Sequence, residues 1–119
     1  MQNWDKKNTI FCDIDGTIFK YRKFETYTTI EAEPIISTIE YLREQTKKGH
    51  MIILTTARPD TLFEHTVWEL GKHFVPYHKL IMGIERGPRY LINDMDPENE
   101  GKRAIAVNLI RDQGYGKLD

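Results

Sequence analysis

The chain of 119 residues contains a single cysteine, Cys12, which excludes an internal disulfide. A lone thiol is typical of proteins of the reducing cytoplasm. No apolar stretch approaches the roughly 20 residues of a membrane span, and residues 1–7 lack the apolar core of a signal peptide. These absences predict a cytoplasmic protein that does not enter a membrane.

The sequence also lacks an excess of either charge. Its 17 Lys and Arg residues balance 18 Asp and Glu residues, for a formal net charge of −1. Proteins that bind nucleic acid usually carry a basic patch, so this balance argues against such a partner. A length of 119 residues is enough for one hydrophobic core. We therefore expect a single domain over residues 1–119.

The most informative segment is 13–17, with the sequence Asp-Ile-Asp-Gly-Thr, which directly follows the apolar run of residues 9–12. Alternate residues of a strand face the same side, so Asp13 and Asp15 should emerge together where the strand ends. Gly16 permits a sharp turn there. Two close carboxylates repel each other unless a cation or a shared proton intervenes, and oxygen ligands favour Mg²⁺. The segment therefore indicates a metal-assisted site.

Two other interpretations of this segment compete with the metal-assisted site. An ordinary acidic turn after a strand stays open, because Asp and Gly are common turn residues. A calcium loop of the EF-hand type requires Gly at its sixth position and Glu at its twelfth, where this chain has Ile18 and Phe24. The calcium interpretation is therefore excluded.

The rest of the sequence alternates between helical and strand patterns. One helix should begin at Pro34 and stop before Gly49. A second should open at Pro59 and present Phe63, Val67 and Leu70 on one face. Strand patterns recur in five places, at residues 9–12, 51–54, 79–82, 90–92 and 104–107. Strands separated by helical segments predict an α/β fold with a mostly parallel, five-stranded sheet.

In such sheets, ligands bind beyond the carboxyl ends of the strands. The first strand carries Asp13 and Asp15 to that edge, the second carries residues 55–58, and the fourth carries residues 93–96. Carboxylates, hydroxyls and an arginine are thus predicted to meet at one edge from three separate segments.

At this point the sequence resembles the haloacid dehalogenase (HAD) superfamily of phosphatases. Segment 13–17 is similar to the first motif of that family, Thr-Thr-Ala-Arg-Pro at 55–59 to its second, and Leu-Ile-Asn-Asp at 91–94 to its fourth. The likeness covers about residues 8–110 in the family's motif order. It implies a Rossmann-like three-layer sandwich and Mg²⁺-dependent phosphoryl transfer.

The resemblance also implies individual roles. Asp13 would attack phosphorus and form an aspartyl-phosphate, and Asp15 would protonate the leaving oxygen and then deprotonate water. Thr56 would hydrogen-bond the transferring phosphoryl oxygens, with Thr55 as the adjacent alternative. Mg²⁺ would be held by Asp13, the backbone carbonyl of Asp15 and Asp94.

The chain departs from the family in one place. A lysine usually precedes the fourth motif, but none occurs between residues 83 and 90. Arg86 and Arg89 are the available cations, and Lys79 lies farther back. We assign the catalytic role to Arg86, because its distance from the fourth motif fits the family spacing better than that of Arg89.

No insertion is long enough for a cap domain. Residues 18–33 have room only for a short flap, whose Arg22 and Tyr27 could meet an anionic substrate, and residues 60–91 are largely used by a helix and a strand. The resemblance then implies a capless protein with an open site, which either accepts macromolecular or extended substrates or is closed by a neighbouring subunit of a homo-oligomer. The remaining substrate-binding candidates are Arg58, Arg89, Gly16 and Thr17.

These features predict a phosphomonoester hydrolase that acts on a small phosphorylated metabolite, such as a sugar phosphate or a nucleotide. Three alternatives stay open. The missing lysine is compatible with a non-catalytic relative that binds a phosphate ligand or a partner. A polynucleotide end phosphatase would use the same chemistry, although the balanced charge disfavours it. A phosphotransferase or mutase of the same fold would need to exclude water, against which the open site argues.

Overall fold

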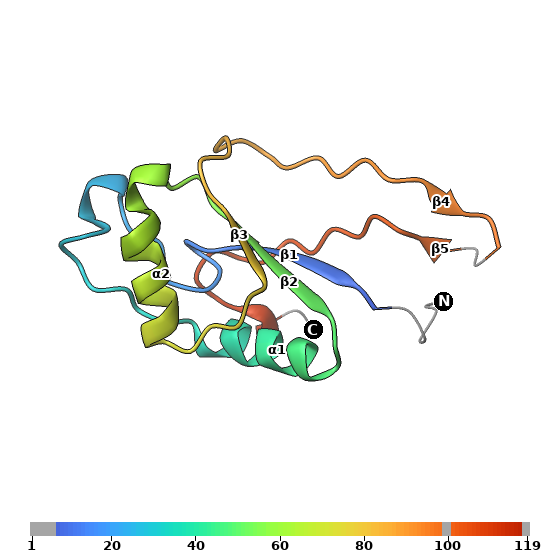
Figure 1. The fold of residues 1–119 in the computed structure, drawn as a ribbon, viewed down its shortest axis with the longest axis horizontal. Coiled ribbons are helices and arrows are strands. Elements are labelled where there is room, and N and C mark those ends of the chain that lie inside the picture. The colour runs from blue at the N-terminus through green and yellow to red at the C-terminus, as the bar shows by residue number, and fades with distance from the viewer. Residues whose placement is uncertain (1–6, 99–100, 118–119) are drawn as a thin grey trace.

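The structure is a computed structural model that describes residues 7–98 and 101–117. Its sheet contains β1 (Thr9–Asp13), β2 (Met51–Thr55) and β3 (Lys79–Ile81), in that order and all parallel. The two helices are α1 (Ile36–Lys47) and α2 (Phe63–Lys72), and β4 (Met95–Asp96) pairs with β5 (Gly101–Lys102) in a separate antiparallel ladder. Neither described helix is long and apolar enough to cross a membrane. Figure 1 shows the arrangement.

The register of the sheet aligns the carboxyl ends of its strands. β1 and β2 pair from Thr9 opposite Met51 to Asp13 opposite Thr55, and Thr55 lies opposite Ile81 of β3. β2 is central, with a paired strand on each edge, and its apolar residues 52–54 are buried. Asp13 therefore emerges level with the end of β2.

One face of the sheet packs on both helices. Ile52 and Leu54 of β2 share a core cluster with Ile39 and Leu42 of α1 and Leu70 of α2. Since successive residues of a strand point to opposite faces, the other face is formed by the odd-numbered residues. On that face Phe11 and Ile81 are exposed. The described chain thus builds two layers.

The predicted three-layer, five-stranded sandwich is not confirmed, because the described parallel sheet has three strands. Residues 90–92 and 104–107, predicted as the fourth and fifth strands, lie outside this sheet. Only residues 82–89 separate β3 from the predicted fourth strand. A crossover between parallel strands usually needs about a dozen residues or more, so this connection is too short to return the chain to the start of the sheet.

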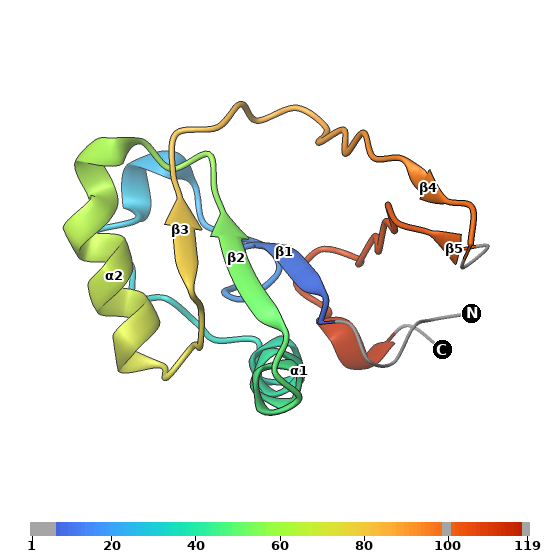
Figure 2. The same ribbon diagram turned by 45° about the vertical axis from the view of Figure 1, so that its right-hand side comes forward.

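Residues 84–110 instead form a projecting arm. Its outgoing limb (84–98) passes over the carboxyl end of the sheet and leaves on the β1 side, and its return limb (101–110) runs back toward the body (Figures 1 and 2). β4 and β5 join the two limbs near the tip, with Met95 opposite Lys102. The arm makes the molecule elongated, with dimensions of 50 × 26 × 26 Å.

The return limb is anchored by the segment that follows it. The backbone N–H of Asp112 donates to the carbonyl of Gly16 at 2.8 Å, and the Asp112 carboxylate accepts the N–H of Tyr21 at 2.8 Å. Farther along, Tyr115 stacks on Tyr41 of α1 with ring centroids 3.7 Å apart. These contacts fix the base of the arm on the loop after β1 and on α1.

A pair of glycine substitutions tests this anchor. Gly114 has φ +82°, and an added Cβ would lie 2.1 Å from Ser37 Oγ and 2.7 Å from Ile35 Cγ2. We expect Gly114→Ala to lower the free energy of unfolding by about 2 kcal/mol or more, through strain and overpacking. The matched variant Gly71→Ala, in α2 with nothing within 4 Å of the new Cβ, should raise it by about 0.5–1 kcal/mol. Urea unfolding measures both, and equal effects would contradict the anchor.

Candidate active site

The loop after β1 places the two aspartates in different surroundings. Ile14 is fully buried, and its carbonyl accepts the N–H groups of Thr17, Ile18 and Phe19, which wraps the chain into a tight turn. The Asp13 side chain is 46% exposed, whereas that of Asp15 is 11% exposed. The predicted pair thus reaches the edge of the sheet with one accessible carboxylate and one nearly buried carboxylate.

Asp15 accepts two hydrogen bonds from Arg58, which follows β2. Arg58 donates from Nε to Oδ2 at 2.9 Å and from Nη2 to Oδ1 at 2.8 Å, a two-pronged arrangement that fixes both carboxylate oxygens. Arg58 is 1% exposed. A buried guanidinium needs further partners, and Nη1 donates to Thr66 Oγ1 at 3.0 Å and to Glu69 Oε1 at 2.9 Å.

Arg22 of the flap completes this arrangement. It donates to both Glu69 oxygens at 2.9 and 3.1 Å, and its Nη2 lies 3.9 Å from Asp15 Oδ1. The ring of Tyr27 stacks against Arg58, with 4.5 Å between the guanidinium carbon and the ring centroid. Two carboxylates and two guanidiniums thus balance in charge, and we call Asp15, Arg22, Arg58 and Glu69 the buried charge network.

The network shifts the acidity of its members. Burial alone would raise the pKa of Glu69, but hydrogen bonds and charges from Arg22 and Arg58 outweigh burial and hold this pKa below its ordinary value. Burial opposes the charge of Arg58 as well, yet Asp15 and Glu69 raise the pKa of the guanidinium further. Both groups are therefore held in their charged forms.

Asp13 lies outside the network and has the opposite shift. Partial burial, together with the negative charge of Asp15, raises the pKa of Asp13 above its ordinary value. Arg89 and the hydroxyl of Thr17 counter part of this effect. Thr17 Oγ1 donates to Asp13 Oδ2 at 3.3 Å, and Arg89 Nη2 lies 3.9 Å from Asp13 Oδ1.

The three cations considered for the missing lysine take different positions. Arg89 is the one beside Asp13. Arg86 instead lies over the ring of Phe24, 5.5 Å from its centroid. Lys79 begins β3 opposite Ile53, at the end of the strand away from Asp13.

The two threonines after β2 also differ. Thr56 is 2% exposed, and its hydroxyl accepts the backbone N–H of Arg58 at 3.0 Å, which leaves the hydroxyl hydrogen for another acceptor. Thr55 is half-buried and pairs with Asp13 across the sheet. Both therefore lie at the edge that carries Asp13.

Asp94 does not join the other predicted metal ligands. It lies on the outgoing limb of the arm, is 72% exposed, and pairs with Arg103 of the return limb at 3.2 Å. Among the described residues, no group of three or more His, Cys, Asp or Glu side chains could hold a metal ion. Asp13 and the Asp15 carbonyl alone make an incomplete set of oxygen ligands for Mg²⁺. The described residues of one chain therefore do not fit the predicted magnesium site.

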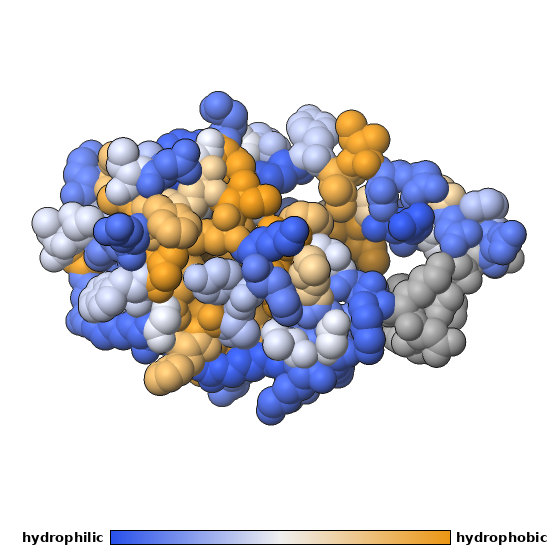
Figure 3. Space-filling model, viewed as in Figure 1, coloured by the Kyte–Doolittle hydropathy of each residue, from blue (hydrophilic) through white to orange (hydrophobic). Residues whose placement is uncertain are grey.

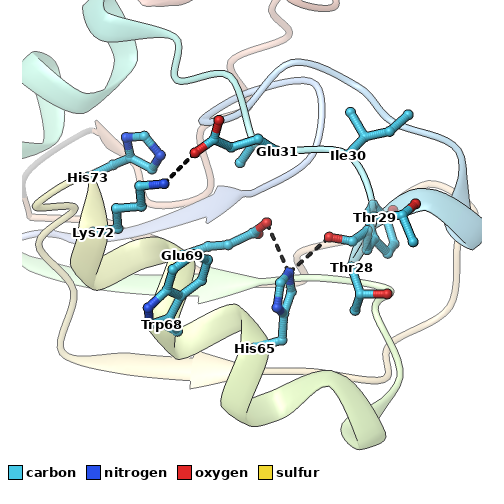
Figure 4. A pocket seen from close by; sticks show the side chains of 11 residues that line it. Thr28, Thr29, Ile30, Glu31, His65, Trp68, Glu69, Lys72 and His73 are labelled. Carbon is cyan, nitrogen blue, oxygen red and sulfur yellow. Dashed lines mark hydrogen bonds and ion pairs between the residues drawn. The ribbon is translucent and has the colours of Figure 1, made fainter.

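A pocket of about 260 Å³ lies between the flap and α2, away from Asp13. Figure 4 shows His65 pointing to Glu69, and an ion pair between Lys72 and Glu31. Nε2 of His65 lies 3.1 Å from Glu69 Oε2 and 2.8 Å from the carbonyl oxygen of Tyr27. Glu69 is shared between this pocket and the buried charge network. Asp13 itself lies on an open surface.

Comparison with known proteins identifies the family of this chain. A family model of haloacid dehalogenase-like hydrolases matches residues 10–80. The chain belongs to this family. The match runs from the second residue of β1 to the second residue of β3, contains Asp13, Asp15 and Arg58, and ends before the arm.

Solved structures support the fold of this HAD-like hydrolase. A chain from the structure of a Pnkp1/Rnl/Hen1 complex is similar, with a TM-score of 0.59 and 22% identity over 69% of this chain and 29% of that one. This chain thus spans less than a third of that relative. A crystal structure from Vibrio cholerae has a TM-score of 0.53 and 23% identity over 77% of this chain and 85% of that one. No curated protein matches the sequence.

Sequence reasoning missed two site residues of this HAD-like hydrolase. Glu69 lies on the buried face of α2 with Thr66 and Leu70, whereas Phe63 of the predicted face is exposed. The available signal in the sequence was that Glu69 directly precedes Leu70, which the helical pattern predicts to be buried. Arg111, from the segment after the arm, packs on Gly16 and lies over the ring of Tyr21 at 4.2 Å. No pattern in the sequence around Arg111 indicates that it lies at the site.

The buried charge network predicts a specific pH dependence of stability. Glu69→Gln should lower the free energy of unfolding by about 3–5 kcal/mol at about pH 7, because it leaves buried guanidiniums without full compensation. The folded pKa of Glu69 lies below its ordinary 4.5, so this stabilisation is complete above that value and is lost as pH falls through the folded pKa. The difference in the free energy of unfolding between the wild-type protein and Glu69→Gln should therefore become smaller in acid.

Urea unfolding from about pH 7 to about pH 3 measures this difference. The matched control is Glu40→Gln, an exposed glutamate of α1, which should shift stability by less than about 0.5 kcal/mol at every pH. A difference that stays constant into acid would show that the charge of Glu69 does not carry the effect.

Proposed function

We propose that this HAD-like hydrolase hydrolyses phosphomonoesters through an aspartyl-phosphate at Asp13. The asymmetry of the two aspartates carries this proposal. Asp13 is accessible and lies outside the buried charge network, as a nucleophile must, while Asp15 is held rigidly beside it by Arg58. The order of motifs within the family match supports the same assignment.

In the first step, Asp13 Oδ forms a bond to phosphorus as the bond from phosphorus to the leaving oxygen breaks. Asp15, protonated at the start of this step, gives its proton to that oxygen and becomes the carboxylate that acts in the second step. In the second step, Asp15 takes a proton from water, whose oxygen attacks phosphorus and frees Asp13. Arg58 donates one hydrogen bond to each Asp15 oxygen, and each oxygen has a second lone pair. The two hydrogen bonds therefore orient the carboxyl group without blocking proton transfer. Arg58 therefore acts here as a positioning residue.

Cations must offset the charge of the phosphoryl group near Asp13. Arg89 lies beside Asp13, and we propose that it takes the role of the missing lysine, in place of Arg86. Arginine can form a forked contact with phosphate. We also propose Mg²⁺ as cofactor, which would supply further charge neutralisation. The described residues of one chain would hold only part of its ligand set, through Asp13 and the carbonyl of Asp15.

The charge balance of the chain bears on the substrate class. A net charge of −1 favours a small phosphorylated metabolite, such as a sugar phosphate or nucleotide, over a polynucleotide end. A single cysteine suits the cytoplasm, where we expect the protein to act. A non-catalytic phosphate-binding protein is the second candidate, and it is supported by the incomplete set of metal ligands among the residues that the structure describes.

A generic aryl phosphate tests the activity. Wild-type protein should release phosphate with Mg²⁺ and lose this activity in EDTA. Asp13→Asn should lower the rate about 10³-fold or more, because it removes the nucleophile. The matched control Asp60→Asn, an exposed aspartate after β2, should retain the wild-type rate. Absence of turnover across a broad panel of phosphomonoesters would instead support the binding protein.

A pair of arginine variants tests which cation serves the site. Arg89→Ala should lower kcat/KM about 10- to 100-fold, since it removes one charged contact near the phosphoryl group. Arg86→Ala should have the smaller effect, because its guanidinium lies on Phe24. Steady-state kinetics on the best substrate of the panel measures both. A larger loss in Arg86→Ala would return the role to Arg86.

A further inference from the structure

β1 ends the sheet with an unused edge. The described sheet has the order β1-β2-β3, so one edge of β1 is paired and the other faces outward without a strand. The face opposite the helices is only partly covered, because Phe11 of β1 is 53% exposed on it, whereas Ile53 of β2 is buried. A five-residue strand with an open edge and an apolar, exposed face is a site for strand addition.

The arm carries side chains suited to a sheet interior. Tyr90 is 88% exposed and Ile92 is 92% exposed, and Leu91, Ile105 and Val107 are also exposed. Figure 3 shows apolar side chains uncovered along the arm. Large apolar side chains rarely stay in water over such a stretch without a partner surface.

The arm cannot easily add to the β1 edge of its own chain in parallel. It leaves β3 at the carboxyl edge, and residues 82–89 are fewer than the dozen or so that a parallel crossover needs. The outgoing limb moves away from the body on the β1 side (Figure 2). A second copy removes this restriction, because the arm of one chain can approach the other sheet from outside.

We propose that two copies exchange arms, so that residues 90–94 of each chain add as a parallel strand to β1 of the other. The two five-residue segments match in length, and alignment of their carboxyl ends pairs Tyr90 with Thr9 and Asp94 with Asp13. The exchange adds a strand to each sheet, turns Leu91 toward the face that the helices cover, and places Ile92 beside the exposed Phe11 on the opposite face. Swapping identical elements is a common route to symmetric dimers.

The exchange also accounts for the missing metal ligand. Asp94 is distant from Asp13 in one chain, where it pairs with Arg103. In the exchanged register, the Asp94 of one copy lies next to the Asp13 of the other, so each active site is completed by two chains. This part of the inference rests on the proposed function, whereas the pairing of strands does not.

Light scattering tests the dimer without reference to activity. The wild-type protein should have twice the mass of one chain, and Ile92→Asp should convert it to the monomer by placing a charge in the new strand. The matched control is Phe74→Asp, an equally apolar residue, 77% exposed, outside the arm. Its positive φ of 55° tolerates Asp, and it should remain a dimer. A monomeric wild-type protein would overturn the proposal.

A disulfide tests the register and the exchange. In a Cys12→Ser background, Thr9→Cys and Tyr90→Cys would lie opposite each other on adjacent strands, within the reach of a disulfide. Oxidation should yield a covalent dimer on a denaturing gel, and neither single-cysteine chain should do so. An internally cross-linked monomer would show pairing within one chain, and an absent cross-link would show no pairing in this register. Either result contradicts the proposal.

Complementation tests the shared active site. Asp13→Asn and Asp94→Asn should each be inactive alone, but co-expressed chains should regain about a quarter of wild-type activity. Half of the random dimers are mixed, and each mixed dimer has one intact site. No recovery would show that Asp94 acts within its own chain or not at all. An inactive wild-type protein would reject the phosphatase, while mass and cross-linking would still decide the exchange.

Discussion

The two hydrogen bonds from Arg58 to Asp15 join parts of the chain that are distant in sequence. Arg58 follows β2, Asp15 follows β1, Glu69 lies on α2 and Arg22 comes from the flap. A fully buried guanidinium is stable only where carboxylates surround it. The position of α2, the closure of the flap and the orientation of Asp15 therefore depend on one another. Asp13, which the network excludes, keeps the accessible carboxylate on which the proposed chemistry depends.

Local patterns predicted the parts of the fold that local forces determine. The apolar runs became β1, β2 and β3, and Gly49, at φ +89°, follows the end of α1 as expected. The first motif was recognised because turn, strand and carboxylates are adjacent in sequence. The burial of Glu69 was not predicted, because helical periodicity identifies a buried face from its apolar residues alone. Its burial depends on guanidiniums contributed by two other segments, which no helical pattern contains.

The arm shows a different limit of sequence reasoning. The apolar pattern of residues 90–92 and 104–107 predicted strands, and such a pattern does indicate segments that favour burial in a sheet. It does not say whether the sheet belongs to the same chain. The length of residues 82–89 was the relevant constraint, because it limits which edge the next strand can reach. The family match ends at residue 80, so the family likeness adds no constraint on the arm.

Exchange of arms would couple assembly to cation binding. Bringing Asp94 of one copy beside Asp13 of the other adds negative charge next to a carboxyl whose pKa is already raised by burial and by Asp15. These charges repel unless a cation lies between them, so such a cation would favour the dimer over separate chains. By linkage, the dimer must then bind that cation more tightly than one chain does. A connection too short for a crossover would in this way make the active site a property of the pair.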